Sequence, residues 1–153
     1  MSDFDAVALF CDDIREEKSG AHSLIGVMAD NVRVPGFPGA LPKLAIHIKI
    51  NLPIDFAHIP IDIFITNPGS PEIFVNTITA ELITNSIETA VVQGSPLAGI
   101  ISNVIAGPFP TIQPGRVLVT LKGAFGTKLI GGLNIQGPEE TSALSTNGQQ
   151  PPA

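Results

Sequence analysis

The sequence has no tryptophan, no tyrosine and a single cysteine, and only 14% of its 153 residues are charged. With one thiol, Cys11, no intrachain disulfide and no zinc site made of several cysteines can form, and a reducing compartment is the natural environment. Eight phenylalanines are the only large aromatic residues, so aliphatic and β-branched side chains must build the core. Such a composition is typical of pleated sheets.

Positive charge is also scarce. Eight lysines and arginines stand against fourteen acids, which gives a formal net charge of −6. The bases are scattered singly, whereas a surface that binds nucleic acid or an anionic membrane needs them in clusters. We therefore expect neither nucleic acid nor membrane among the partners.

Long apolar runs are missing as well. The first ten residues are acidic and have too short an apolar stretch for a signal peptide. The most apolar segments, 44–52 and 59–65, contain polar or charged residues and are much shorter than a membrane span. These features predict a soluble, cytoplasmic protein.

Fifteen glycines and fourteen prolines divide the chain into many short segments, which favours strands joined by turns. The clearest strand is 43–52, in which apolar residues alternate with more polar ones, one face buried and one wet. A second alternating run, 59–66, is expected to pair with this strand or to face it.

Three hairpins are predicted from turn signals. The first joins 6–14 to 22–28 around Gly20, and the last joins 116–125 to 128–135 around Gly126. Between them, Asn67-Pro-Gly-Ser70 is typical of a type II turn and leads into a long strand, 73–83, with a bulge or bend near Thr77. A further short strand is expected at 89–92.

One segment breaks the strand pattern. Leu97, Ile100, Ile101, Val104 and Ile105 follow helical spacing, with Ser95 as a candidate N-cap, Pro96 as first helical residue and Gly107 as the stop. We predict a short helix here. The alternative is another buried strand, because Gly99 and the β-branched residues lower helix propensity.

The whole pattern predicts an all-β fold, a two-layer antiparallel β-sandwich of the immunoglobulin-like or C2-like kind. Residues 1–137 are expected to form the single domain, and the polar residues 138–153 a disordered tail.

Several short motifs resemble a family of small uncharacterised bacterial β-sandwich proteins. They are Leu9-Phe-Cys-Asp-Asp-Ile-Arg15, Lys18-Ser-Gly20, Ser23-Leu-Ile-Gly-Val27, Leu41-Pro42 with the strand that follows, Asn67-Pro-Gly69, and Pro114-Gly115-Arg116-Val117. The resemblance extends over most of residues 5–135 and departs from the family pattern at 97–105. It implies the fold and carries over no catalytic residue.

The densest group of carboxylates surrounds Asp12 and Asp13. Together with Glu16, Glu17 and Asp30 they offer the oxygen ligands that Ca²⁺ prefers, but their spacing matches no calcium loop. Solvated charge at a strand end is the favoured interpretation, so we predict no metal site.

The other reactive residue types also give no catalytic motif. His22, His47 and His58 are far apart in sequence, and His47 is expected to be exposed beside Lys49. Cys11 lies in phase with buried strand residues and is expected to be an inert thiol. Without a nucleophile elbow, a phosphate-binding loop or a zinc-protease motif, we predict no catalytic residue and no cofactor.

Two proline-flanked phenylalanines, Phe37 and Phe109, are the candidate partner-binding residues, although capping of the sandwich ends is the favoured role for both. The leading hypothesis is a non-enzymatic binding or assembly module that binds a protein or forms a homo-oligomer. The alternatives are a metal-dependent sensor or enzyme that uses Asp12 and Asp13 with a histidine, and a structural component of a larger particle.

Overall fold

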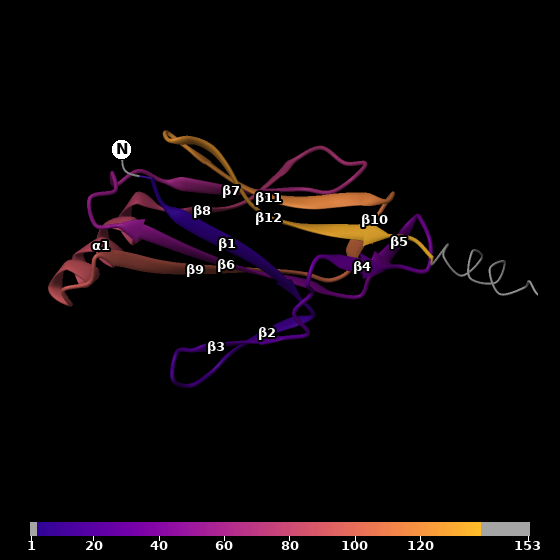
Figure 1. The fold of residues 1–153 in the computed structure, drawn as a ribbon, viewed down its shortest axis with the longest axis horizontal. Coiled ribbons are helices and arrows are strands. Elements are labelled where there is room, and N and C mark those ends of the chain that lie inside the picture. Colours follow the sequence, from indigo (N-terminus) through magenta and orange to yellow (C-terminus); the bar gives the residue numbers. More distant parts are fainter. Residues whose placement is uncertain (1–2, 139–153) are drawn as a thin grey trace, which may run out of the picture.

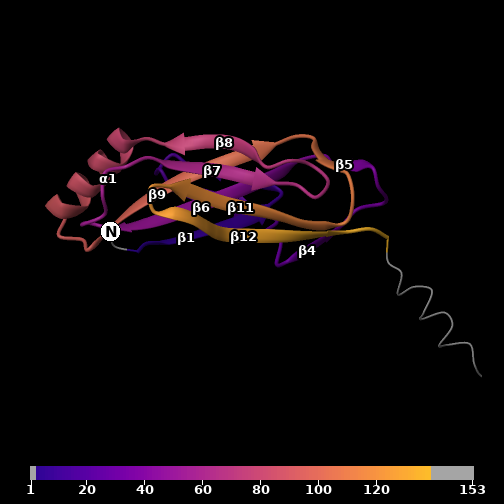
Figure 2. The same ribbon diagram turned by 90° about the horizontal axis from the view of Figure 1, so that it is seen from above.

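The computed structural model describes residues 3–138, which form two packed β-sheets, two small two-stranded sheets and one short helix at one end (Figures 1 and 2). The predicted tail therefore lies, apart from Pro138, outside the described residues. The elements in chain order are β1 (Asp5–Cys11), β2 (Asp13–Glu16), β3 (His22–Ile25), β4 (Asn31–Arg33), β5 (Gly39–Leu41), β6 (Leu44–Pro53), β7 (Ile61–Thr66), β8 (Ile73–Ile78), α1 (Ala80–Val92), β9 (Leu97–Ala106), β10 (Phe109–Thr111), β11 (Gly115–Gly123) and β12 (Gly126–Gln136).

The first sheet has three antiparallel strands in the order β1-β6-β9. β6 is its centre and follows the alternation seen in the sequence. Its core-facing side chains are almost completely removed from solvent, and each is large and aliphatic. They are Leu44, Ile46, Ile48, Ile50 and Leu52.

The second sheet has five strands in the order β4-β12-β11-β7-β8, antiparallel except for the parallel pair of β4 with β12. Its inner side chains join those of β6 in one hydrophobic core. β7 therefore faces the three-stranded sheet and does not pair with β6. The sheets approach closely where Gly131 lies against Ala8, because a Cβ at Gly131 would stand only 2.8 Å from the Ala8 carbonyl oxygen. The predicted all-β sandwich is confirmed.

The predicted hairpins are also found. β7 and β8 flank the Asn67–Ser70 turn, which is closed by the Ser70 amide donating to the Asn67 carbonyl at 2.9 Å. β11 and β12 form the C-terminal hairpin around Gly126. The first predicted strand is divided: β1 stays in the sheet, while β2 pairs with β3 in a separate hairpin. Gly20 at the turn of that hairpin has φ +90°, which suits a residue without Cβ.

The helix prediction was wrong in position. Residues 97–106 form β9, which pairs with β6 over its entire length. Inward Ala98, Ile100 and Ser102 are buried, and the residues between them are exposed, which is the period of a strand. The β-branched residues and Gly99 disfavour a helix, and ten residues of pairing with β6 outweigh the chance helical spacing of the apolar side chains.

The helix α1 instead occupies part of the segment predicted as strands over 73–83 and 89–92. Thr79 is its N-cap, with its hydroxyl accepting from the Leu82 amide at 3.1 Å, and Ile83, Ile87 and Ala90 form the buried face. The shift of the apolar pattern near Thr77 thus marks the end of β8 and the start of α1. A pairing irregularity does occur in β8, between Asn76 and Phe74.

The cap predicts a measurable stability change. Replacing Thr79 by alanine leaves the Leu82 amide without its acceptor and should lower the free energy of unfolding by about 0.5–2 kcal/mol. Urea denaturation followed by circular dichroism measures the loss, and Thr79→Ser, which keeps the hydroxyl, should retain most of the stability. Equal losses in the two variants would contradict the capping role.

Candidate interaction surface

The outer face of the three-stranded sheet combines exposed aliphatic side chains with a histidine, an asparagine and a lysine. Strand pairing arranges its residues in rows across β1, β6 and β9, and most of these rows mix apolar with polar residues. The rows are Val7–Lys49–Ile101, Leu9–His47–Asn103 and Cys11–Ala45–Ile105. We call these nine residues the outer face.

The β2–β3 hairpin turns back over part of this outer face (Figure 1). His22 on β3 comes close to His47, with ring centroids 5.8 Å apart. Asn103 on β9 links the two: its Oδ1 lies 2.8 Å from His47 Nδ1, and its Nδ2 lies 2.8 Å from His22 Nδ1. One amide thus joins two imidazoles: the Asn103 carbonyl oxygen accepts from His47 Nδ1, and the Asn103 amide nitrogen donates to His22 Nδ1.

The structure corrects the prediction that His47 is exposed. Only 9% of its surface is accessible, because the hairpin covers it. The alternation along β6 correctly places His47 away from the core, but a strand pattern does not reveal that another segment folds back over the outer side. Two of the three histidines are thus brought together, while His58 is elsewhere and bonds through Nδ1 to the Thr84 hydroxyl at 2.9 Å.

Cys11 lies under the base of the same hairpin and has no exposed surface. Its Sγ is 3.7 Å from the Ala45 carbonyl oxygen. Burial raises the pKa of the thiol above its ordinary value, and the nearby charge of Asp12 acts in the same direction. The thiol is therefore protonated at neutral pH and is a poor nucleophile.

Asp12 and Asp13 lie at the junction between β1 and the hairpin. Asp13 Oδ1 accepts from Lys43 Nζ at 2.6 Å and from the Ile14 amide at 2.9 Å. The hydrogen bond from Lys43 is the main reason that the pKa of Asp13 is lowered. The Asp13 carboxylate therefore links the hairpin to the residue before β6. Its neighbour is the Lys43 ammonium, whereas a metal ion would need further anionic ligands around it. The Asp12 side chain packs against Gly26.

The part of the outer face beyond the hairpin exposes apolar side chains. Ile101 is 41% exposed and Ile105 53%, and Val7 and Leu9 across the sheet are exposed to a similar degree. Ile25 and Val27, at and after the end of β3, are exposed as well. A concentration of exposed aliphatic residues of this kind marks a surface suited to another protein.

β9 also ends the sheet, because no strand pairs with its second side. Pro53, opposite Leu97, has no amide proton, and the Leu97 amide and carbonyl bond instead to Ser95 Oγ. Backbone groups of an antiparallel strand alternate in direction. Residues in phase with Leu97 therefore direct their N–H and C=O groups to the open side: Gly99, Ile101, Asn103 and Ile105.

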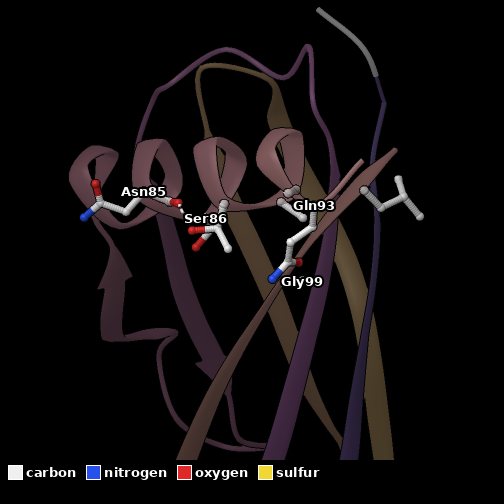
Figure 3. A pocket seen from close by; sticks show the side chains of 8 residues that line it. Asn85, Ser86, Gln93 and Gly99 are labelled. Atoms are coloured by element: carbon white, nitrogen blue, oxygen red, sulfur yellow. Dashed lines mark hydrogen bonds between the residues drawn. The ribbon is translucent and has the colours of Figure 1, made fainter. Parts of the chain in front are cut away.

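A shallow depression of about 280 Å³ lies between α1 and the beginning of β9 (Figure 3). Neutral polar side chains line it on the helix side: Asn85, Ser86, Thr89 and Gln93. Leu97, Ala98 and Gly99 form its strand side, so α1 lies beside this end of β9. The depression contains no charged or titratable group and is therefore better suited to a neighbouring chain than to catalysis.

The phenylalanines predicted as partner-binding candidates are at the opposite end from α1. Phe109 on β10 is buried, and Phe37 is partly buried against the core. β10 pairs with β5 at this end of the sandwich. Phe109 therefore offers almost no surface to a partner. Sequence reasoning missed Ile101 and Asn103 because it assigned their segment to a helix.

Two kinds of feature are absent from residues 3–138. No three or more histidine, cysteine, aspartate or glutamate side chains gather in a geometry that could hold a metal ion. No helix in this part of the chain is long and apolar enough to cross a membrane.

Comparison with known proteins gives a family but no activity. Residues 6–122 match the model of a family of unknown function, DUF6941. The chain belongs to this family. The match extends from the second residue of β1 almost to the end of β11, so it includes the whole outer face and both strands of the hairpin. No curated protein matches the sequence. The resemblance to a family without known function is confirmed, whereas a bacterial origin stays a prediction.

The amide bridge predicts that the hairpin depends on Asn103. Asn103→Ala leaves His47 buried without its partner and should cost about 1–3 kcal/mol in unfolding free energy. Hydrogen exchange at β2 and β3 should accelerate more than elsewhere. Asn76→Ala, at an exposed position of β8, is the matched control and should change neither quantity. Unchanged exchange in the hairpin would argue against the bridge.

Cys11 gives a prediction that depends on pH. Because its folded pKa is raised, the folded state holds the thiol proton more tightly, so stability is unaffected below the ordinary thiol pKa and falls as pH rises above it. Cys11→Ala removes this contribution. The unfolding free energy of Cys11→Ala should decline less between neutral and alkaline pH than that of the wild type. An equal decline in the two proteins would contradict a raised pKa for Cys11. An aromatic disulfide reagent should label native Cys11 far more slowly than the unfolded chain.

Proposed function

We propose that this protein is a non-enzymatic binding or assembly module that acts by adding a polypeptide strand to the open side of β9. The adjoining apolar part of the outer face would receive side chains of the added strand. Strand addition gains affinity from backbone hydrogen bonds and specificity from alternate side chains. We also propose a cytoplasmic setting, with which the single free cysteine agrees, and a bacterial origin, which the resemblance of the motifs implies.

The observation that carries the proposal is the unprotected edge of β9 beyond Gly99, because α1 lies beside only the first residues of the strand. Proteins usually guard edge strands by charge, proline, bulges or short length. Among the end strands of the two main sheets in residues 3–138, β4 is three residues long and contains Arg33, β1 begins with Asp5, and β8 is irregular between Asn76 and Phe74. β9 has ten residues, pairs regularly, and contains no charged residue and no proline.

The rival hypotheses have less support. A metal-dependent role for Asp12 and Asp13 would have to displace the Lys43 ammonium from Asp13. Participation in a larger particle is compatible with strand addition, since the partner strand could belong to such a particle.

A peptide titration tests the proposal. A fluorescent ten-residue peptide of alternating valine and threonine should bind the dilute protein, with chemical-shift changes concentrated at the amides of Gly99, Ile101, Asn103 and Ile105. Ile101→Pro removes the backbone N–H that points to the open side of β9 and leaves the pairing with β6 intact, so it should abolish peptide binding and the chemical-shift changes. Ile101→Thr, which keeps the donor and the β propensity, should retain it. Binding that persists in Ile101→Pro, or shifts located away from β9, would refute the proposal.

A further inference from the structure

We propose that the strand added to β9 is β9 of a second copy of this chain, in an antiparallel pair about a two-fold axis at Ile101. The inference rests on the proposed function and specifies the partner. Two three-stranded sheets would become one sheet of six strands.

The argument begins with symmetry. In an antiparallel pair about a two-fold axis, residues equally distant from the axis lie opposite each other, and directly opposed side chains share a face. With the axis at Ile101, the two copies of Ile101 meet at the centre. Leu97 then lies opposite Ile105 of the second copy, and Gly99 lies opposite Asn103. The N–H and C=O groups of Leu97 are bonded to Ser95 Oγ, so Leu97 and Ile105 would meet through their side chains alone.

This register matches the exposed surface of β9. The three large apolar residues on the outer side are Leu97, Ile101 and Ile105, which are 48%, 41% and 53% exposed in the single chain. All three find an apolar partner when the axis is at Ile101. An axis at Asn103 would leave Leu97 beyond the end of the pairing, and an axis at Gly99 would do the same to Ile105. Only the central register pairs every exposed apolar side chain of the strand.

The polar residues agree with the same arrangement. Asn103 is occupied by its bonds to His22 and His47, and the residue opposite is glycine, which makes no demand on the amide. No charge in β9 opposes association. The nearest cation in the central row, Lys49 on β6, lies beyond Ile101, so the isoleucine pair separates the two lysines. α1 lies beside Leu97–Gly99, and the depression between the helix and β9 is the space that residues 103–105 of the second copy would enter.

Charge exchange at the axis tests the partner and the register together. Ile101→Lys and Ile101→Glu each place like charges opposite each other, so each variant alone should be monomeric in sedimentation velocity at concentrations where the wild type is a dimer. An equimolar mixture should recover the dimer. Val92→Lys and Val92→Glu are the controls: Val92 is 86% exposed on α1 and outside the pairing, so both should dimerise like the wild type.

A second mixture fixes the register. Leu97→Lys mixed with Ile105→Glu should form the dimer more strongly than either variant alone, whereas Ile101→Lys mixed with Ile105→Glu, the pairing of an axis at Asn103, should not recover it. The reverse result would overturn the central register.

The remaining outcomes separate this inference from the proposed function. A monomeric wild type at every attainable concentration, or dimers that persist in Ile101→Lys, would overturn the second-copy inference. If the valine–threonine peptide then still binds at β9, the module adds a strand from another protein and the proposed function stands. If the peptide also fails to bind, both are refuted.

Discussion

The arrangement of the molecule depends on β6, the one strand of the first sheet that is paired on both sides. Its inward leucines and isoleucines lie at the centre of the core between the sheets, and burial of each such side chain contributes roughly 1.5–3 kcal/mol. A shift of one residue would exchange the two faces and bury Lys49 in the core. The register of β1 and β9, and hence every row of the outer face, is thereby fixed.

The hairpin adds a second layer to this face. Because β1 leaves the sheet after Cys11, β2 and β3 can fold back, and the links from Lys43 to Asp13 and from Asn103 to His22 keep them there. The covered side includes the Cys11 thiol and the His47 imidazole, which are buried, while His22 on the hairpin is partly buried. The uncovered side keeps the aliphatic residues of β9 exposed. One sheet face is thus divided into a part covered by the hairpin, which includes His47 and Cys11, and an exposed part in which aliphatic residues surround Lys49.

The sequence predicts those parts of the structure that depend on local signals. The alternation of β6, the Asn67–Ser70 turn and the Gly126 hairpin need only neighbouring residues to specify them. The sequence predicted strand over most of 80–92 and helix over 97–106, and the structure shows the reverse. Local signals could not separate the two segments, because both are rich in β-branched residues and both contain apolar side chains at helical spacing. Pairing with β6 makes residues 97–106 a strand. The Thr79 cap and the burial of Ile83 and Ile87 stabilise residues 80–92 as a helix. The bridge through Asn103 joins residues 81 and 56 positions apart, which no local pattern encodes.

An unprotected edge strand is ordinarily an aggregation hazard, which makes the manner of its pairing important. A two-fold pair uses the open side of β9 in both copies at once. The sheet of six strands would then end on both sides in β1, where Asp5 carries a charge and the chain turns away into the hairpin after Cys11. An isologous contact of this type closes on itself, whereas a head-to-tail contact through the same edge would continue into a filament. The protection missing from β9 is thus present at the strands that would form the new edges, so pairing of β9 would stop at two copies.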